Sequence, residues 1–273
     1  MLGLGLIVLL VGAAALAPLL APYDPTVGYA REGLSQRGLP VPPLSPGPSR
    51  AFLLGTDGLG RDVLSRVLFG ARVSLTIGLV ANTLSMLLGL AVGVVGGYAR
   101  GAIGHLVMRV TDVVMAVPTL LFAMALVTVL RPGLVVIVVV IALAYWTYLA
   151  RIVFGEVRSL REKEFVDAAR CVGASDARIV VRHVLPNLVS VAVVYASLSA
   201  ANMILTEATL SFLGIGVRPP TPSWGGMLSE GQQFFLTSPW MLLAPGGMLL
   251  LTLLGFNLLG DGLRDALDPR RHA

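Results

Sequence analysis

The sequence predicts an all-α, polytopic membrane protein with about six transmembrane helices. Of its 273 residues, 56% are hydrophobic and only 13% are charged, whereas a soluble chain of this length needs far more polar surface. Apolar runs of about 20 residues, long enough to cross a bilayer as helices, also recur from one end of the chain to the other.

Six runs have the length and composition of membrane spans. Pro118 lies inside the third run and is expected to kink it, because proline removes a backbone hydrogen bond from a helix. The predicted spans are Leu2–Leu20, Val73–Tyr98, Val110–Leu130, Leu134–Val153, Leu188–Phe212 and Met241–Leu259.

The long segment between the first two spans is predicted to lie outside the membrane. Residues 26–50 are rich in Pro and Gly and lack periodicity, which indicates irregular structure. The role of the stretch 31–50 stays open. Leu54–Arg66 predicts a turn that leads into a short amphipathic helix.

Arginine placement predicts the orientation of the chain. Positively charged residues gather in the cytoplasmic loops of membrane proteins, and here they crowd the loop 156–186 and the C-terminal tail. The short loops on the opposite side offer only Arg131 and Arg218. Both termini and the loop 156–186 are therefore expected in the cytoplasm, and the basic excess is expected to meet lipid headgroups rather than nucleic acid.

These expectations divide the chain into three parts. Residues 1–72 form an N-terminal membrane helix and an extracytoplasmic loop, 73–262 form the transmembrane domain, and 263–273 form a cytoplasmic tail. Pro18 after Ala15–Ala17 argues against a signal-peptide cleavage site, and no basic residue precedes the first apolar run. The missing basic residue suggests that the natural chain starts upstream of Met1.

The polar loop 156–186 is predicted to form two helices around a tight turn. Glu156–Val172 has helix-forming composition, Gly173 suits a left-handed helix end, and Ser175 suits the start of the next helix. Pro186 is expected to end that second helix. The small residues at the turn would let another protein approach closely. Two alternatives are a merely solvated loop and a DNA-binding helix-turn-helix over 164–184.

Small residues recur at four-residue spacing along the second span. Such a stripe lets a neighbouring helix approach closely in a bilayer, although the same face could line a pathway. We expect helix packing. The stripe consists of Ala81, Ser85, Gly89, Gly93 and Gly97.

Two acidic residues fall inside predicted spans, where ionisable groups are costly and often functional. Asp112 follows Arg109 by about one helical turn, so an interfacial ion pair between them is expected. Glu207 lies twenty residues beyond Asn187, roughly 30 Å along a helix and hence near the outer interface. Either a structural hydrogen bond to the following loop or a place at the outer gate of a pathway would explain it.

Catalytic and cofactor chemistry find no support in the sequence. A phosphate-binding loop needs a lysine after a glycine-rich turn, but Lys163, the only lysine, lies between two glutamates. The three histidines are scattered, so neither a metal site nor a catalytic triad is indicated. Cys171 is the only cysteine, which excludes an intrachain disulfide. We expect no enzyme, no cofactor and no metal.

The loop carries a spaced pattern: Asp167-Ala168-Ala169, three residues, Gly173, nine residues, then His183-x-Leu185-Pro186. This pattern closely resembles the coupling loop of bacterial ABC-importer permeases. Further stretches resemble the "C"-type permease of the dipeptide, oligopeptide and nickel branch, and together they cover nearly the whole chain. They are Ala17–Pro25, Leu54–Asp57, Gly60–Asp62, Gly70–Leu75, Glu207–Gly214 and Pro219–Gly225.

The resemblance implies the fold of a type I ABC-importer transmembrane domain and the role of a permease for di- or oligopeptides or similar solutes in the cytoplasmic membrane. A nickel or other non-peptide importer of the same architecture is the alternative. The implied partners are a second permease, two ATP-binding subunits that hydrolyse the ATP, and an extracytoplasmic solute-binding protein. Asp167 stands where the family usually has glutamate. The implied ATPase-coupling residues are Glu164, Asp167, Ala168, Ala169, Gly173, His183, Leu185 and Pro186.

Overall fold

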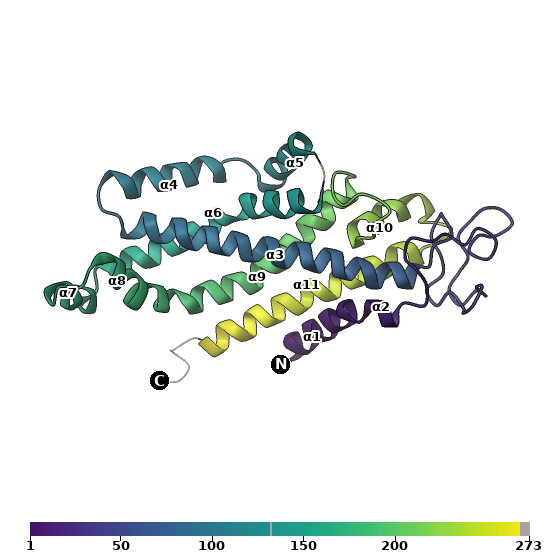
Figure 1. The fold of residues 1–273 in the computed structure, drawn as a ribbon, viewed down its shortest axis with the longest axis horizontal. Helices are drawn as coiled ribbons and strands as arrows, with labels where there is room; N and C mark the ends of the chain where they lie inside the picture. The colour runs from purple at the N-terminus through teal and green to yellow at the C-terminus, as the bar shows by residue number, and fades with distance from the viewer. Residues whose placement is uncertain (132, 268–273) are drawn as a thin grey trace.

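The structure, a computed structural model, describes residues 1–131 and 133–267, and helices dominate them (Figure 1). Long helices lie side by side along the longest axis of the molecule. The short helices α7 and α8 lie at one end of this bundle, and the irregular segment 21–62 lies at the other. Neighbouring pairs in the bundle are α3 with α6, α3 with α9, α9 with α11, and α1 with α11.

Four uninterrupted helical runs in the described residues are long and apolar enough to cross a membrane. They contain four of the six predicted spans, so the all-α membrane class is confirmed. The runs are α3 (Val63–Tyr98), α6 (Leu134–Arg161), the run Asp176–Phe212 that comprises α8 (Asp176–Ile179), a π-turn (Val180–Val184) and α9 (Leu185–Phe212), and α11 (Trp240–Leu267).

The predicted first span is two helices rather than one. α1 covers Leu2–Ala15 and α2 covers Ala17–Leu20, with Leu16 between them at φ −84° and ψ 4°. Pro18 explains the break, because it has no N–H to donate to the carbonyl one turn earlier. α1 packs against α11 and α3.

The predicted third span is broken more sharply than a kink. α4 (Ala102–Met115) and α5 (Thr119–Leu130) meet at an angle of 84°. Pro118 is the N-cap of α5, and a residue that precedes proline is pushed out of the helical region. The two helices together could count as a fifth, broken span.

α3 begins earlier than the sequence suggests and absorbs the predicted short amphipathic helix. Its N-cap is Asp62, whose carboxylate accepts a hydrogen bond of 2.7 Å from the Ser65 N–H. The helix then runs without a break for 36 residues, about 54 Å at 1.5 Å per residue. It therefore extends well beyond a hydrocarbon core of about 30 Å.

The extended end of α3 is covered by segment 21–62 and by α10 (Trp224–Gly231) with the following turn Gln232–Phe234. Segment 21–62 consists of turns and isolated bridges, as predicted for its Pro-rich part. Arg61 and Arg66 connect segment 21–62 to α10 by ion pairs. Both guanidinium groups contact Glu230 of α10 (2.7 and 2.8 Å) and Asp57 of the segment (2.6 and 3.3 Å). We call this structure the outer cap, because the orientation predicted from the sequence places it outside the cytoplasm.

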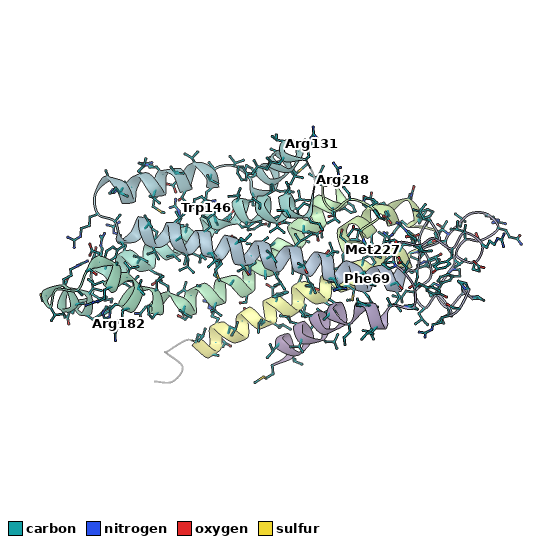
Figure 2. The ribbon with its side chains drawn as sticks, viewed as in Figure 1. Phe69, Arg131, Trp146, Arg182, Arg218 and Met227 are labelled. Atoms are coloured by element: carbon teal, nitrogen blue, oxygen red, sulfur yellow. The ribbon has the colours of Figure 1, made fainter. Side chains whose placement is uncertain are left out.

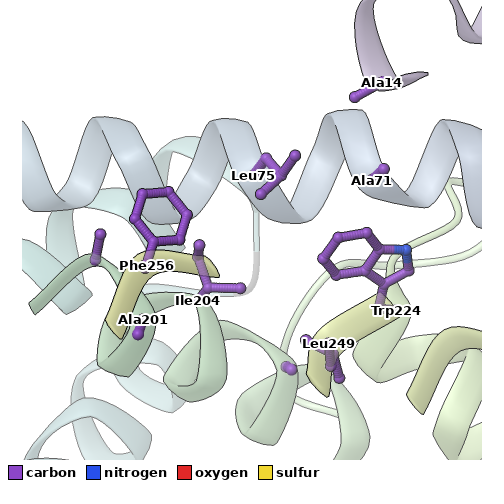
Figure 3. Close-up of a cluster of buried hydrophobic side chains, with 10 residues drawn as sticks. Ala14, Ala71, Leu75, Ala201, Ile204, Trp224, Leu249 and Phe256 are labelled. Carbon is purple, nitrogen blue, oxygen red and sulfur yellow. The ribbon is translucent and has the colours of Figure 1, made fainter. Parts of the chain in front are cut away.

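The core between the helices is filled by small and large apolar residues in alternation. Trp224 is fully buried and its indole N–H donates to the Val67 carbonyl at 3.1 Å. Figure 3 shows Trp224 beside α3, with Leu75, Ile204 and Phe256 further along the same cluster.

The stripe of small residues on α3 faces α6. A Cβ added at Gly93 would lie 2.7 Å from the Ala150 carbonyl oxygen, and one at Gly89 would lie 2.7 Å from that of Trp146. At Gly97 the equivalent distance to the Phe154 carbonyl oxygen is 2.8 Å. The two backbones therefore approach so closely that only glycine fits.

Candidate functional site

The loop 156–186 forms the end of the bundle opposite the outer cap. Figure 2 shows Arg182 in this region, whereas Arg131 and Arg218 lie far from it along the long axis. The expected single helix 156–172 is divided, because α6 ends at Arg161 and α7 (Glu164–Cys171) begins after an extended Lys163. This break turns α7 so that Val166 and Ala169 are buried.

The turn after α7 has the geometry that the sequence predicts. Gly173 has φ +82°, a left-handed conformation that L side chains disfavour. Its N–H donates to the Arg170 carbonyl at 2.9 Å and the Ala174 N–H donates to the Ala169 carbonyl at 3.0 Å, which is the Schellman pattern. Ser175 then caps α8 by accepting from the Arg178 N–H at 3.4 Å.

α7 presents two faces of opposite character. Val166 and Ala169 pack in one apolar cluster with Ile179 and Val184 of the following helices and with residues of α3 and α6. The opposite face is exposed and carries the remaining implied docking residues of this helix, together with the apolar side chains Phe165 and Val172 (85% exposed). These docking residues are Glu164, Asp167 and Ala168.

Three polar contacts fasten the loop to the end of α3. The Tyr98 hydroxyl donates to Asp176 Oδ1 at 2.6 Å, and Arg161 Nη1 donates to the Tyr98 carbonyl at 3.3 Å. Hydrogen bonding to Tyr98, and then to Asp167, raises the pKa of Arg170 above its ordinary value, so this guanidinium stays charged. Sequence patterns did not predict these contacts, because Tyr98 and Asp176 are 78 positions apart.

Pro186 does not end the second helix as expected. α8 continues through the π-turn Val180–Val184 into α9, and Pro186 lies in the first turn of α9. The wider π-turn accommodates a residue that has no N–H to donate. In the same turn, Asn187 Nδ2 donates to the His183 carbonyl at 2.6 Å.

The other predicted loop residues lie close to this turn. The ring centroids of His183 and Phe165 are 6.3 Å apart, and Leu185 is partly buried against the apolar cluster under α7. Gly173 and Pro186 are exposed. The eight predicted residues thus fall into two sets. The exposed ones are Glu164, Asp167, Ala168, Gly173 and Pro186, and the partly or fully buried ones are Ala169, His183 and Leu185.

Glu207 is fully buried rather than open to a pathway. Its Oε1 accepts from the Ser211 hydroxyl at 2.8 Å, and the Ser211 oxygen accepts from the Val217 N–H at 3.1 Å. Of the two interpretations, the geometry favours the structural link from α9 to the loop that follows it.

The expected Asp112–Arg109 ion pair is wrong. Asp112 on α4 pairs with Arg151 on α6, across two helices. Both side chains stay about half exposed, with 41% of Asp112 and 52% of Arg151 accessible. The i, i+3 spacing made Arg109 the nearest cation along the sequence, but the packing of α4 against α6 offers a different one.

The bundle with its projecting loop is the architecture of an ABC-importer membrane subunit. Residues 85–273 match the family of binding-protein-dependent transport system inner membrane components, and residues 1–39 match the N-terminal transmembrane domain of oligopeptide transport permease C. The chain belongs to this permease family.

The chain is similar to permeases of peptide transport systems. The chain is 42% identical to the di/tripeptide permease DppC of Pseudomonas aeruginosa over 98% of this chain and 87% of the relative. It is 39% identical to the oligopeptide permease OppC of Bacillus subtilis (99% and 85% covered) and 40% identical to the glutathione permease GsiD of Pectobacterium atrosepticum (97% and 84% covered).

A solved structure supports the fold independently of close sequence similarity. The MetNI methionine ABC transporter in an inward-facing conformation superimposes with a TM-score of 0.60 at 17% identity. The match covers 75% of this chain and 97% of that one. At this level of identity the likeness concerns the fold, which is that of a type I ABC-importer transmembrane domain.

Proposed function

We propose that this permease imports di- or oligopeptides and that the loop 156–186 couples it to ATP hydrolysis by partner subunits. The names of the relatives above support a peptide as the solute. A second permease, two ATP-binding subunits and an extracytoplasmic binding protein would complete the transporter. In this arrangement both termini and the loop 156–186 face the cytoplasm, and the outer cap faces the binding protein.

The observation that carries the coupling role is the contrast between the two faces of α7. The buried face fixes α7 to the ends of α3 and α6, and the Tyr98–Asp176 hydrogen bond holds the next helix to the same point. The exposed face offers small residues, a carboxylate and uncovered apolar side chains. Exposed apolar surface beside a charge is typical of a protein contact site.

Because the loop is fastened to three long helices, a push on α7 would move them as a unit. Closure of the partner ATPases on ATP would therefore tilt the bundle and switch access of the solute pathway between the two sides. Rigid-body motion of this kind is an established mode of switching.

The two alternative functions, nickel import and DNA binding, are not supported by features of this kind. Nothing in the site favours nickel over a peptide. A DNA-binding helix-turn-helix would need a second helix free to enter a groove, but here α8 runs directly into the membrane span α9, and Ile179 is buried.

Reconstitution tests the proposal. The chain, its partner permease, two ATPase subunits and the binding protein are placed in liposomes, and peptide uptake and ATP hydrolysis are measured. Ala168→Trp, on the exposed face of α7, should abolish uptake and weaken ATPase association. Ala102→Trp, exposed at the start of α4 at the same end of the bundle, should leave both largely unchanged.

Three outcomes are decisive against the proposal. Uptake that survives Ala168→Trp with normal ATPase association would remove the coupling role of α7. Absence of peptide uptake by the complete wild-type complex would remove the peptide as solute. ATP hydrolysis by the purified chain alone would contradict the assignment of that activity to the partners.

A further inference from the structure

α4 has three distinct faces. Gly104, Met108 and Thr111 are buried against the bundle. A second, exposed face is apolar and consists of Ile103, Leu106, Val110 and Val113. The third face, also solvent-accessible in this chain, is polar and consists of His105, Arg109 and Asp112. A helix that met only lipid on its accessible side would have no reason for the third face.

α6 carries a matching polar face. Tyr148, Arg151, Gly155 and Arg158 recur at helical spacing and are all exposed, whereas Leu149, Val153 and Val157 on the other side are buried. These four residues include no aliphatic side chain, although the neighbouring Ile152 is also exposed. The four would therefore be a poor surface against hydrocarbon.

Polar side chains of α6 meet polar side chains of α4 at two levels and of α5 at a third. His105 and Arg158 line one cavity of about 150 Å³ at the end of the bundle that carries α7. Further in, Asp112 pairs with Arg151. Further still, the Thr119 hydroxyl at the start of α5 lies 3.3 Å from the Tyr148 hydroxyl. A continuous polar strip thus runs along the α4–α6 boundary.

The position of the Asp112–Arg151 pair along its helices indicates whether the strip faces lipid or water. Asp112 lies ten residues from the start of α4 and Arg151 ten residues from the end of α6, so each is about 15 Å from its helix end. The pair therefore lies inside the two candidate membrane spans, 102–130 and Leu134–Arg161, rather than at their ends. Charged residues at such depth face a protein interior or a water-filled cavity rather than lipid, and both side chains are about half exposed.

We propose that this polar strip lines the water-filled inner half of the solute pathway. Within it, the Asp112–Arg151 pair is the transient binding site for the charged ends of a zwitterionic solute. A solute ammonium group would displace Arg151 from Asp112, and a solute carboxylate would take up the freed guanidinium. A half-exposed ion pair is weak enough to exchange partners in this way. The assignment rests on the proposed import function.

Cysteine accessibility tests the position of the strip. In a Cys171→Ser background, Arg109→Cys and Asp112→Cys represent the polar face of α4, and Val110→Cys and Val113→Cys represent its apolar face at the same depth. A charged, membrane-impermeant methanethiosulfonate is added to inverted vesicles that hold the assembled transporter. The polar-face thiols should react at least tenfold faster. Equal rates on the two faces, or an unreactive polar face, would overturn the proposal.

Uptake tests the binding site. The double variant Asp112→Asn with Arg151→Gln keeps both side chains polar and removes both charges. Uptake of a dipeptide should fall at least fivefold, while stimulation of ATP hydrolysis by the loaded binding protein changes less than twofold. Millimolar dipeptide should also slow labelling of the Arg109→Cys variant, in which both Asp112 and Arg151 are kept. Unchanged uptake and labelling would refute the binding site. Failure of the wild-type transporter to take up any peptide would instead refute the import function, whatever the labelling shows.

Discussion

The hydroxyl of Tyr98, the last residue of α3, donates a 2.6 Å hydrogen bond to Oδ1 of Asp176, the first residue of α8. This bond ties the long membrane helix α3 to the loop that, in the proposed function, contacts the ATPase. Asp176 also lies at a helix N-terminus, where a carboxylate is favoured by the helix dipole. One side-chain contact therefore joins a membrane span to the candidate coupling site.

Tyr98→Phe should loosen this connection while preserving the fold. The lost bond is worth about 1 kcal/mol, too little to unfold a bundle of this size. We expect peptide uptake per ATP hydrolysed to fall severalfold in proteoliposomes. Tyr29→Phe, a matched change in the outer cap, should leave the ratio unchanged. An unaltered ratio in Tyr98→Phe would show that the bond plays no part in coupling.

Glu230→Gln should destabilise the outer cap. Arg61 and Arg66 are almost completely buried and both contact this carboxylate. Its loss leaves two buried guanidinium groups with Asp57 as their shared carboxylate, and breaking a buried ion pair by removing one partner costs up to about 3–5 kcal/mol. Thermal unfolding in detergent should show a clear drop in midpoint. Glu32→Gln, an exposed acid in the same cap, is the control, and equal midpoints for the two variants would contradict the prediction.

Gly93→Ala should weaken the packing of α3 on α6. The new methyl group would lie 2.7 Å from the Ala150 carbonyl oxygen, a backbone atom that cannot move alone. Overpacking of this kind costs about 1–3 kcal/mol. Gly155→Ala makes the same change on α6 where no atom lies within 4 Å, and should be neutral or stabilising by about 0.5–1 kcal/mol. Similar melting temperatures for both variants would argue against a tight α3–α6 contact.

Cys171 allows the orientation to be measured without added cysteines. Its thiol is exposed on the loop 156–186. An impermeant maleimide should label it in inverted vesicles without bound ATPase and should not label it in intact cells. Arg31→Cys in a Cys171→Ser background, located in the outer cap, should give the reverse pattern. Labelling of Cys171 from outside intact cells would invert the proposed topology.

The features that follow from local sequence were the ones predicted well. The α7 turn is an example, because Gly173 and Ser175 determine helix end and helix start by their own conformational preferences. The uninterrupted span α9 was likewise visible as an apolar run. The prediction that Pro186 ends the second helix was wrong. The helix continues through the π-turn, and Pro186 lies in the first turn of α9.

The features that depend on packing could not be predicted. Asp112 was assigned to Arg109 because the sequence reveals only neighbours on the same helix, whereas its partner lies on α6. Glu230 is 169 positions from Arg61, so no spacing rule connects them. Glu207 was expected near the outer interface, but its complete burial and its hydrogen bond from Ser211 appear only in the folded chain.

The unbroken course of α3 has a mechanical consequence. One end carries Arg66, locked to Glu230 in the outer cap, and the other carries Tyr98, locked to Asp176 beside α7. Between them, Gly89 and Gly93 are wedged against α6 without room to bend. In the proposed topology, α3 therefore forms one continuous connection about 54 Å long between the cap and the loop on opposite sides of the membrane, and a displacement of the cap would be carried along it to the loop.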